Sequence, residues 1–143
     1  MPYAVVIPAY NEAATVRDLA ARALAYCPRV IVVDDGSTDG TAPALAGLGV
    51  SLLRHDANRG KAAALWSGIQ QALAQAAAGV ITLEGDGQHA PEDIPRLIAV
   101  AKRHPDRVIV GARRADRSQA PLSRYCANRF ADFWLSWTCG QRL

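Results

Sequence analysis

The most chemically suggestive stretch of the chain is residues 81–89, where a short apolar run stops at Glu84 and Asp86. Residues i and i+2 of an extended segment point to the same side, so both carboxylates can present oxygens toward one point. Carboxylate oxygens at a strand end suit a hard divalent cation, Mg²⁺ or Mn²⁺, that already carries phosphate. By itself the pattern E-G-D-G is more typical of a strand followed by a polar turn, so the surrounding elements must decide between the two interpretations.

Apolar runs alternate with helical patterns along the whole chain. We expect strands over residues 4–7, 30–33, 50–53, 80–83 and 107–111. Helices are expected over about 11–27, through the forties, over 61–78, over 91–102 and from 121 onward. Continuous apolar strands separated by helices are typical of a parallel sheet covered on both faces. The predicted fold class is therefore α/β, with a mostly parallel sheet and helices on both faces.

Local signals place some of the boundaries. Pro8 is expected to end the first strand, because proline cannot donate to a sheet ladder. Asn11 is expected to cap the first helix, and Asp39 or Thr41 the second. His55 and His104 have the sequence context of surface residues.

Length and composition limit the class of protein. The 143 residues suffice for one domain, and half of them are hydrophobic, as in ordinary soluble α/β proteins. The three cysteines, Cys27, Cys126 and Cys139, show no C-x-x-C spacing, so neither a zinc site nor a disulfide framework is indicated. Apolar runs are far shorter than a membrane span, and the first residues lack a signal-peptide pattern. We therefore expect a cytoplasmic protein.

Charge is distributed unevenly. Residues 1–95 hold 6 basic and 10 acidic side chains, a net −4, whereas residues 96–143 hold 10 basic and 3 acidic ones, a net +7. A basic segment that also carries Phe130, Phe133, Trp134 and Trp137 could face an anionic membrane or a phosphorylated ligand. It could equally be a solvated arginine-rich helix face. Nucleic acid is a weaker expectation, because no recognition motif accompanies the charge.

Polar clusters follow the first, second and fourth predicted strands, at residues 8–12, 34–39 and 84–89. In parallel sheets the ligand binds at the carboxyl ends of the strands, so these clusters should converge on one crevice. A dinucleotide site is not indicated, since no G-x-G-x-x-G follows the first strand. A Walker-type lysine loop is absent, and neither a haloacid-dehalogenase nor a receiver-domain arrangement of acidic residues fits the spacing.

A nucleotide-sugar site fits the clusters better. A carboxylate at Asp34 or Asp35 could accept an N–H of uracil or guanine, and Lys61 could neutralise a phosphate. Glu84 and Asp86, with Gln88, could hold the cation that bridges the diphosphate. Such a cation acts as a Lewis acid on the departing nucleoside diphosphate.

Four ordered motifs resemble the family 2 glycosyltransferases, and within them the dolichyl- or polyprenyl-phosphate sugar transferases. They are V-I-P-A-Y-N-E from residue 6, V-V-D-D-G-S-T-D-G-T from residue 32, N-R-G-K from residue 58 and E-G-D-G-Q-H-A-P-E-D-I from residue 84. The resemblance covers essentially the whole chain. It implies a Rossmann-like GT-A fold, an NDP-sugar donor (UDP or GDP), Mg²⁺ or Mn²⁺, and inversion at the anomeric carbon.

The resemblance also implies site residues. The expected nucleotide-binding residues are Pro8, Ala9, Tyr10, Glu12, Asp34, Asp35, Gly36, Lys61 and Gly85. The expected metal ligands are Glu84, Asp86 and Gln88, with Glu84 standing where the family has the first aspartate of D-x-D. The residues expected to act in catalysis are Asp86, Arg113, matched to a strand-end G-S-R segment, and Arg124, which with Ser123 and Asn128 resembles the acceptor-side helix.

The expected acceptor is a polyprenyl phosphate, with a glycan hydroxyl as the alternative. The chain ends where the family continues, so we expect one incomplete domain over 1–143, with a nucleotide-sugar part in 1–95 and the start of an acceptor-side part in 96–143. A competing hypothesis is a nucleotide-sugar-binding remnant completed by a partner chain or a homodimer through the aromatic C-terminal helix. Peripheral contact with the inner face of the membrane, in cell-wall biogenesis, would suit the lipid acceptor.

Overall fold

A four-stranded parallel sheet forms the centre of the fold. The computed structural model describes residues 3–87 and 89–111, and its strand order is β3-β2-β1-β4. The strands are β1 (Ala4–Ala9), β2 (Val30–Asp34), β3 (Ser51–Arg54) and β4 (Val80–Thr82), and each adjacent pair is parallel. The chain divides into two compact units, 1–109 and 110–143, and the fold described here is that of the first.

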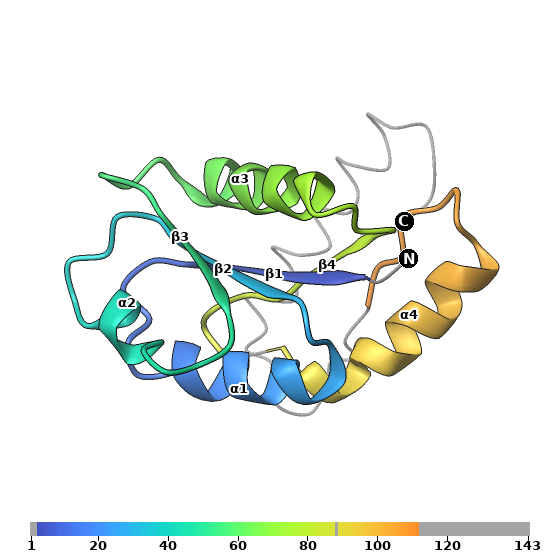
Figure 1. Cartoon of the computed structure of the whole chain (residues 1–143), viewed down its shortest axis with the longest axis horizontal. Helices are drawn as coiled ribbons and strands as arrows, with labels where there is room; N and C mark the ends of the chain where they lie inside the picture. The colour runs from blue at the N-terminus through green and yellow to red at the C-terminus, as the bar shows by residue number, and fades with distance from the viewer. Residues whose placement is uncertain (1–2, 88, 112–143) are drawn as a thin grey trace, which may run out of the picture. The chain divides into compact units, whose positions relative to one another are not determined.

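Helices cover both faces of this sheet (Figure 1). They are α1 (Val16–Tyr26), α2 (Thr41–Ala44), α3 (Lys61–Ala74), the 3₁₀ turn η1 (Pro91–Asp93) and α4 (Ile94–Arg103). One buried cluster joins α1 and α4 to side chains such as Val5, Ile7 and Val32, and the other joins α3 to Val6, Ile31 and Val33. Alternate residues of β1 and β2 thus pack into the two clusters on opposite faces of the sheet, which explains why the sequences of these strands are continuously apolar. The predicted α/β class with helices on both faces is confirmed.

Helix α3 lies unusually close to the sheet at Gly68. A Cβ at this position would lie 2.4 Å from Val6 Cγ1 and 3.1 Å from Val33 Cγ2. Only a residue without a side chain allows this approach, so Gly68 sets the distance between α3 and the centre of the sheet.

The sequence suggests that Pro8 ends the first strand, but the structure shows that it does not. Strand β1 continues through Pro8, which is in register with Val33, to Ala9. The Val6 carbonyl faces β4 and accepts the Leu83 N–H. The backbone nitrogen of Pro8, two residues later, faces the same side of the strand. Pairing with β4 has stopped by then at Thr82, so the missing N–H of proline costs no ladder bond.

Asn11 does not cap the first helix either, because α1 begins only at Val16. The Asn11 side chain instead accepts the Thr38 N–H at 3.0 Å, and its backbone adopts a φ of 55°. A contact with a distant loop therefore takes the place of the local cap.

Other elements are shorter than expected or are not formed. Helix α3 ends at Ala74, and Ala76 with a φ of 53° follows it. The strand expected over 107–111 is not formed in the described residues: the side chains of Val108 and Val110 are 91% and 81% exposed, and no described strand pairs with them. Among residues 3–111, apart from 88, no helix has the length and apolar character needed to cross a membrane.

Candidate functional site

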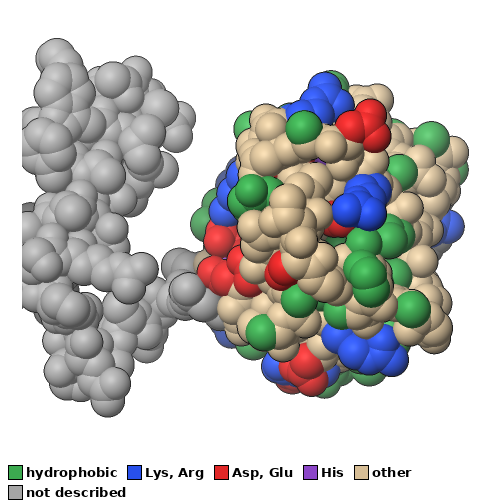
Figure 2. Space-filling model, turned by 90° about the vertical axis from the view of Figure 1, so that its left-hand side faces the viewer, with side chains coloured by type: hydrophobic (Ala, Val, Ile, Leu, Met, Phe, Trp, Pro, Cys, Tyr) green, Lys and Arg blue, Asp and Glu red, His purple; other side chains and the backbone are tan. Residues whose placement is uncertain are grey.

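The polar clusters after β1, β2 and β4 meet at the carboxyl ends of the strands, as predicted. Figure 2 views this end of the sheet, where acidic and basic side chains are interspersed. A cavity of about 150 Å³ lies there. Its lining residues come from all four sequence motifs: Pro8, Ala9, Glu12, Asp35, Lys61, Ala64, Glu84, Gly85 and Asp86.

Asp35 makes several hydrogen bonds at the cavity. Its Oδ1 accepts the Arg59 N–H at 3.0 Å and pairs with His55 Nδ1 at 2.6 Å. Its Oδ2 accepts the Gly60 N–H at 2.8 Å. Asp35 thereby ties the end of β2 to the loop that opens α3, and this loop carries Lys61 to the cavity.

Burial alone would raise the pKa of Asp35, since its side chain is only 3% exposed. The hydrogen bond with His55 and the two backbone N–H groups of Arg59 and Gly60 outweigh burial and hold the pKa below its ordinary value. The carboxylate is therefore ionised at neutral pH and can only accept hydrogen bonds.

The side chain of His55 is largely buried, so the expectation that it lies on the surface was wrong. Its side chain is 8% exposed, and its Nε2 lies 2.9 Å from Ser67 Oγ in α3. Because Asp35 is ionised, the Nδ1 atom of His55 carries the proton that Asp35 accepts. His104, in contrast, is exposed as expected.

Asp34 has a different environment from its neighbour. Its side chain is fully buried, Oδ1 accepts the Ser37 N–H at 2.9 Å, and Oδ2 lies 3.2 Å from Arg54 Nε without hydrogen-bond geometry. Asp34 lies outside the lining of the cavity that holds Asp35. Its contacts are those of a residue that shapes the turn after β2.

The turn after β2 also clamps the segment after β1. Three successive backbone N–H groups, those of residues 11, 12 and 13, donate to Ser37 Oγ, Thr41 Oγ1 and Asp39 Oδ2 at 2.9, 2.8 and 3.1 Å. Asp39 Oδ1 in turn accepts the Thr41 N–H at 2.9 Å. These side chains fix one wall of the cavity. The expectation that Asp39 or Thr41 caps the second helix was wrong: α2 has Gly40 as its N-cap, with no side-chain cap hydrogen bond. Both side chains instead accept backbone N–H groups of the segment after β1.

Gly36 is required for the packing of the turn after β2 against the loop after β3. It has a φ of +73°, and a Cβ there would lie 2.4 Å from the carbonyl carbon of Ala57. The turn after β2 and the loop after β3 therefore pass each other at a distance that no other residue allows. Gly36 itself lines a different cavity, described below.

Glu84 and Lys61 form an ion pair at the cavity, with Lys61 Nζ 2.7 Å from Glu84 Oε1. The backbone around Glu84 is fixed from two sides: His89 Nδ1 accepts the Glu84 N–H at 3.1 Å, and Thr15 Oγ1 donates to the Gly85 carbonyl at 2.7 Å. The first of these contacts gives His89 a structural role in the turn.

The chemistry of this donor set fits a divalent cation. Glu84 and Asp86 supply carboxylate oxygens to one cavity, which Mg²⁺ and Mn²⁺ prefer, and these ions take further oxygens from phosphate and water. Residues 3–87 and 89–111 contain no cluster of three or more histidine, cysteine or carboxylate side chains suited to a metal. Within these described residues, Glu84 and Asp86 are the side chains that could hold the ion, and Mg²⁺ bound with a nucleotide usually has only one or two carboxylate ligands.

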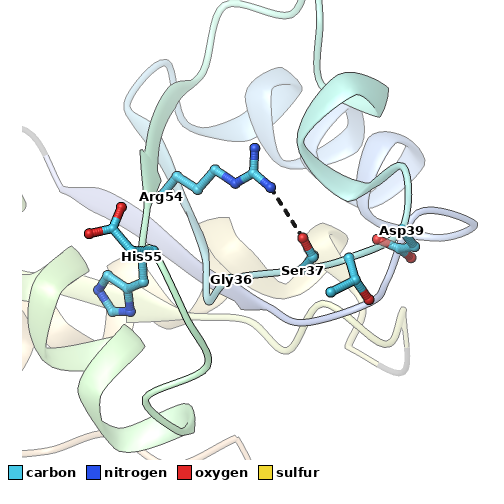
Figure 3. A pocket seen from close by; sticks show the side chains of 7 residues that line it. Gly36, Ser37, Asp39, Arg54 and His55 are labelled. Atoms are coloured by element: carbon cyan, nitrogen blue, oxygen red, sulfur yellow. Dashed lines mark hydrogen bonds between the residues drawn. The ribbon is translucent and has the colours of Figure 1, made fainter.

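A second cavity, of about 640 Å³, lies along the turn after β2 and the end of β3 (Figure 3). Its lining is Gly36, Ser37, Thr38, Asp39, Arg54, His55 and Asp56. Arg54 reaches over it to donate from Nη2 to the Ser37 carbonyl at 3.1 Å, while the His55 ring points toward α3 (Figure 3).

The remaining expected site residues divide into two groups. Tyr10 is described but lies outside the lining of the first cavity, with 44% of its surface exposed. Gln88, Arg113, Ser123, Arg124 and Asn128 fall outside the described residues, as does the expected aromatic C-terminal helix. Thr15, His55 and Ser67 also hold the first cavity together, and no motif in the sequence indicates this role.

The sequence profile of the glycosyl transferase family 2 matches residues 4–135. The chain belongs to this family. It is 35% identical over 97% of its length to the undecaprenyl-phosphate 4-deoxy-4-formamido-L-arabinose transferase of Pectobacterium atrosepticum, and covers 44% of that protein. The enzyme of the same name from Pseudomonas fluorescens is 36% identical over 85% of the chain, which covers 38% of it. The chain thus spans less than half the length of these relatives.

A solved structure agrees with the family assignment. Glucosyl-3-phosphoglycerate synthase from Mycobacterium tuberculosis, in complex with Mn²⁺, UDP and glucosyl-3-phosphoglycerate, superposes with a TM-score of 0.57 at 26% identity. The match covers 68% of this chain and 38% of that one. The expected GT-A fold is confirmed by this likeness together with the parallel sheet.

Proposed function

We propose that this chain binds the donor of a glycosyl transfer, a nucleoside diphosphate sugar, with Mg²⁺ or Mn²⁺. The observation that carries the proposal is the cavity in which Asp35, Lys61, Glu84 and Asp86 meet. It combines an ionised acceptor for a nucleobase N–H, a cation for phosphate and two carboxylates for a metal. The M. tuberculosis relative, crystallised with Mn²⁺ and UDP, supports this choice of ligands.

Within this proposal each residue has a defined task. Asp35 accepts the N–H of the base, and Pro8 and Ala9 form the wall beside it. Lys61 places positive charge near the phosphates, and Asp86 and Glu84 hold the metal, with Gln88 as a third ligand proposed from sequence alone. When bound, the metal supplies charge stabilisation for the departing diphosphate.

The proposed acceptor is a polyprenyl phosphate, and the proposed stereochemical course is inversion. A lipid phosphate is already anionic at neutral pH, with a second pKa of about 6, so no general base is needed to activate it. The protein then has to position two anions and neutralise their repulsion. Arg113 and Arg124 are proposed for this task, and the names of the undecaprenyl-phosphate relatives support the lipid acceptor.

A second candidate function is donor binding without efficient transfer. It is favoured by one observation, that the residues proposed for the donor, Asp35, Lys61, Glu84 and Asp86, already line one cavity within residues 1–95.

Two measurements test the proposals in sequence. Calorimetry of the 143-residue chain with UDP or GDP and Mn²⁺ should detect binding, and an Asp86→Asn variant should lose most of it. Turnover is then followed with labelled UDP- and GDP-sugars and either a short-chain polyprenyl phosphate or a glycan acceptor. Transfer to the hydroxyl acceptor alone would refute the lipid part, and binding without transfer or hydrolysis would favour the second candidate. Absence of nucleotide binding would refute both.

A further inference from the structure

Asp35 has almost exhausted its capacity to accept hydrogen bonds. A carboxylate offers about four lone-pair positions, two on each oxygen. In this structure Oδ1 is used by both His55 Nδ1 and the Arg59 N–H, and Oδ2 by the Gly60 N–H. One position remains, on Oδ2, and Asp35 lines the cavity.

A single acceptor position does not suit all nucleobases equally. Uracil presents one N–H, that of N3, between two carbonyl groups. Guanine presents two adjacent donors, N1–H and the N2 amino group, and needs an acceptor on each carboxylate oxygen to satisfy both. Adenine and cytosine present a ring nitrogen that is itself an acceptor, which a carboxylate oxygen repels. A polar group left unpaired in a binding site costs affinity, so the number of acceptors discriminates between bases.

We propose that His55 is a positioning residue that determines base specificity. By occupying Oδ1 together with the Arg59 N–H, it leaves Asp35 one acceptor in the cavity and thereby selects uracil over guanine. This inference rests on the proposed function, in which Asp35 meets the base.

The surroundings hold His55 in this position. Its side chain is 8% exposed and is anchored on the far side by Ser67 Oγ at 2.9 Å, so it cannot turn away without losing two partly buried hydrogen bonds. The loop that supplies the Arg59 and Gly60 N–H groups is held by its close approach to Gly36. The three donors to Asp35 are therefore preorganised before any ligand arrives.

A ligand series on the unaltered chain tests the acceptor count. Binding of UDP, GDP and 3-methyluridine diphosphate is measured by calorimetry with Mn²⁺. We expect UDP to bind at least ~10-fold more tightly than either of the others, because each leaves a donor or an acceptor unpaired. Equal or tighter binding of GDP, or undiminished binding of the methylated nucleotide, would overturn this inference and leave the proposed function standing. Failure of all three to bind would overturn both.

Two polar substitutions test His55 itself. The amide nitrogen of asparagine can take the place of Nδ1, and that of glutamine the place of Nε2. His55→Asn should therefore keep the donor to Asp35 and retain the UDP preference, whereas His55→Gln should lose that donor and reduce the UDP-to-GDP affinity ratio several-fold, with GDP binding more tightly than before.

His104→Gln, at an exposed histidine, serves as the control and should leave the ratio unchanged. Thermal melting of each variant separates loss of fold from loss of selectivity. An unchanged ratio in His55→Gln, or the same reduction in both His55 variants, would overturn the role of His55. Failure of both variants to fold would overturn the role of His55 in base selection in favour of a purely structural one, and the ligand series would then decide only the acceptor count of Asp35.

Discussion

Lys61 and Glu84 come from different motifs, and their 2.7 Å ion pair joins the loop before α3 to the turn after β4. Their side chains are 58% and 44% exposed, so solvent screens the pair and it contributes little to the stability of the fold. The pair should affect ligand binding instead, because the Lys61 ammonium group is proposed to bind phosphate and the Glu84 carboxylate is proposed to bind the metal. A cation that binds Glu84 must compete with the ammonium group of Lys61.

We predict opposite effects of Lys61→Met on the two ligands. Affinity for Mn²⁺ without nucleotide should rise a few-fold, since the competing positive charge is removed. Affinity for a nucleoside diphosphate should fall, since its phosphates lose a cation. Titration of Mn²⁺ by electron paramagnetic resonance and calorimetry of UDP measure the two quantities. In the control variant Glu84→Gln, Mn²⁺ affinity should fall; a loss of Mn²⁺ affinity in Lys61→Met as well would contradict the prediction.

Several residues of the cavity could be predicted from sequence, and the reason is geometric. Asp35 directly follows β2, and Glu84 and Asp86 lie within four residues of the end of β4. The apolar character of these strands predicts a parallel sheet, so the convergence of the three side chains follows from topology. His55 also follows a strand, but its burial depends on how the loop of residues 55–60 folds back over Asp35. No feature of the local sequence reports that path, and a lone histidine in a polar segment resembles a surface residue.

The elements themselves were predicted better than their ends. All four strands of the sheet contain the residues expected at their centres, because a continuous apolar run is a strong signal. The errors arise where long-range contacts replace local signals: Pro8 is tolerated because β4 has already ended, and Asn11 binds Thr38 instead of capping α1. Residues 107–111 have the composition of a strand, and the described residues offer them no pairing partner.

At the scale of the elements, we predict that Gly68→Ala destabilises the protein. The added methyl would lie 2.4 Å from Val6 Cγ1, so α3 must move away from β1. Overpacking of this kind typically costs 1–3 kcal/mol, and the better helix propensity of alanine returns up to about 1 kcal/mol. We expect a net loss of about 1–2 kcal/mol in the free energy of unfolding, measured by urea denaturation.

Gly49→Ala is the matched control for this substitution. No atom lies within 4 Å of a Cβ built at Gly49, and its φ is outside the left-handed region. Its stability should stay within about 0.5 kcal/mol of the unaltered protein. Equal stability of the two variants would show that α3 can shift freely on the sheet and that Gly68 does not fix its distance.

Charge divides the whole molecule into two unlike parts. Residues 1–95, which contain all the lining of the donor cavity, carry a net −4, and residues 96–143 carry a net +7. The acidic part includes carboxylates that the proposal assigns to a metal and to a base. The basic part holds the arginines proposed for the acceptor phosphate. An anionic membrane surface would therefore attract the part of the chain proposed to receive its lipid acceptor.

We predict that the 143-residue chain binds vesicles containing anionic lipid and does so through residues 96–143. Each basic side chain near such a surface contributes about 1 kcal/mol, and salt screens the attraction within a Debye length of about 10 Å at 0.1 M. The chain should therefore sediment with phosphatidylserine-containing vesicles at low salt and be released at high salt.

Arg114→Gln with Arg117→Gln should weaken binding to these vesicles by roughly 10-fold or more. The matched double variant Arg17→Gln with Arg59→Gln, in the acidic part, should bind nearly as the unaltered chain does; equal losses in both would show that net charge alone governs binding.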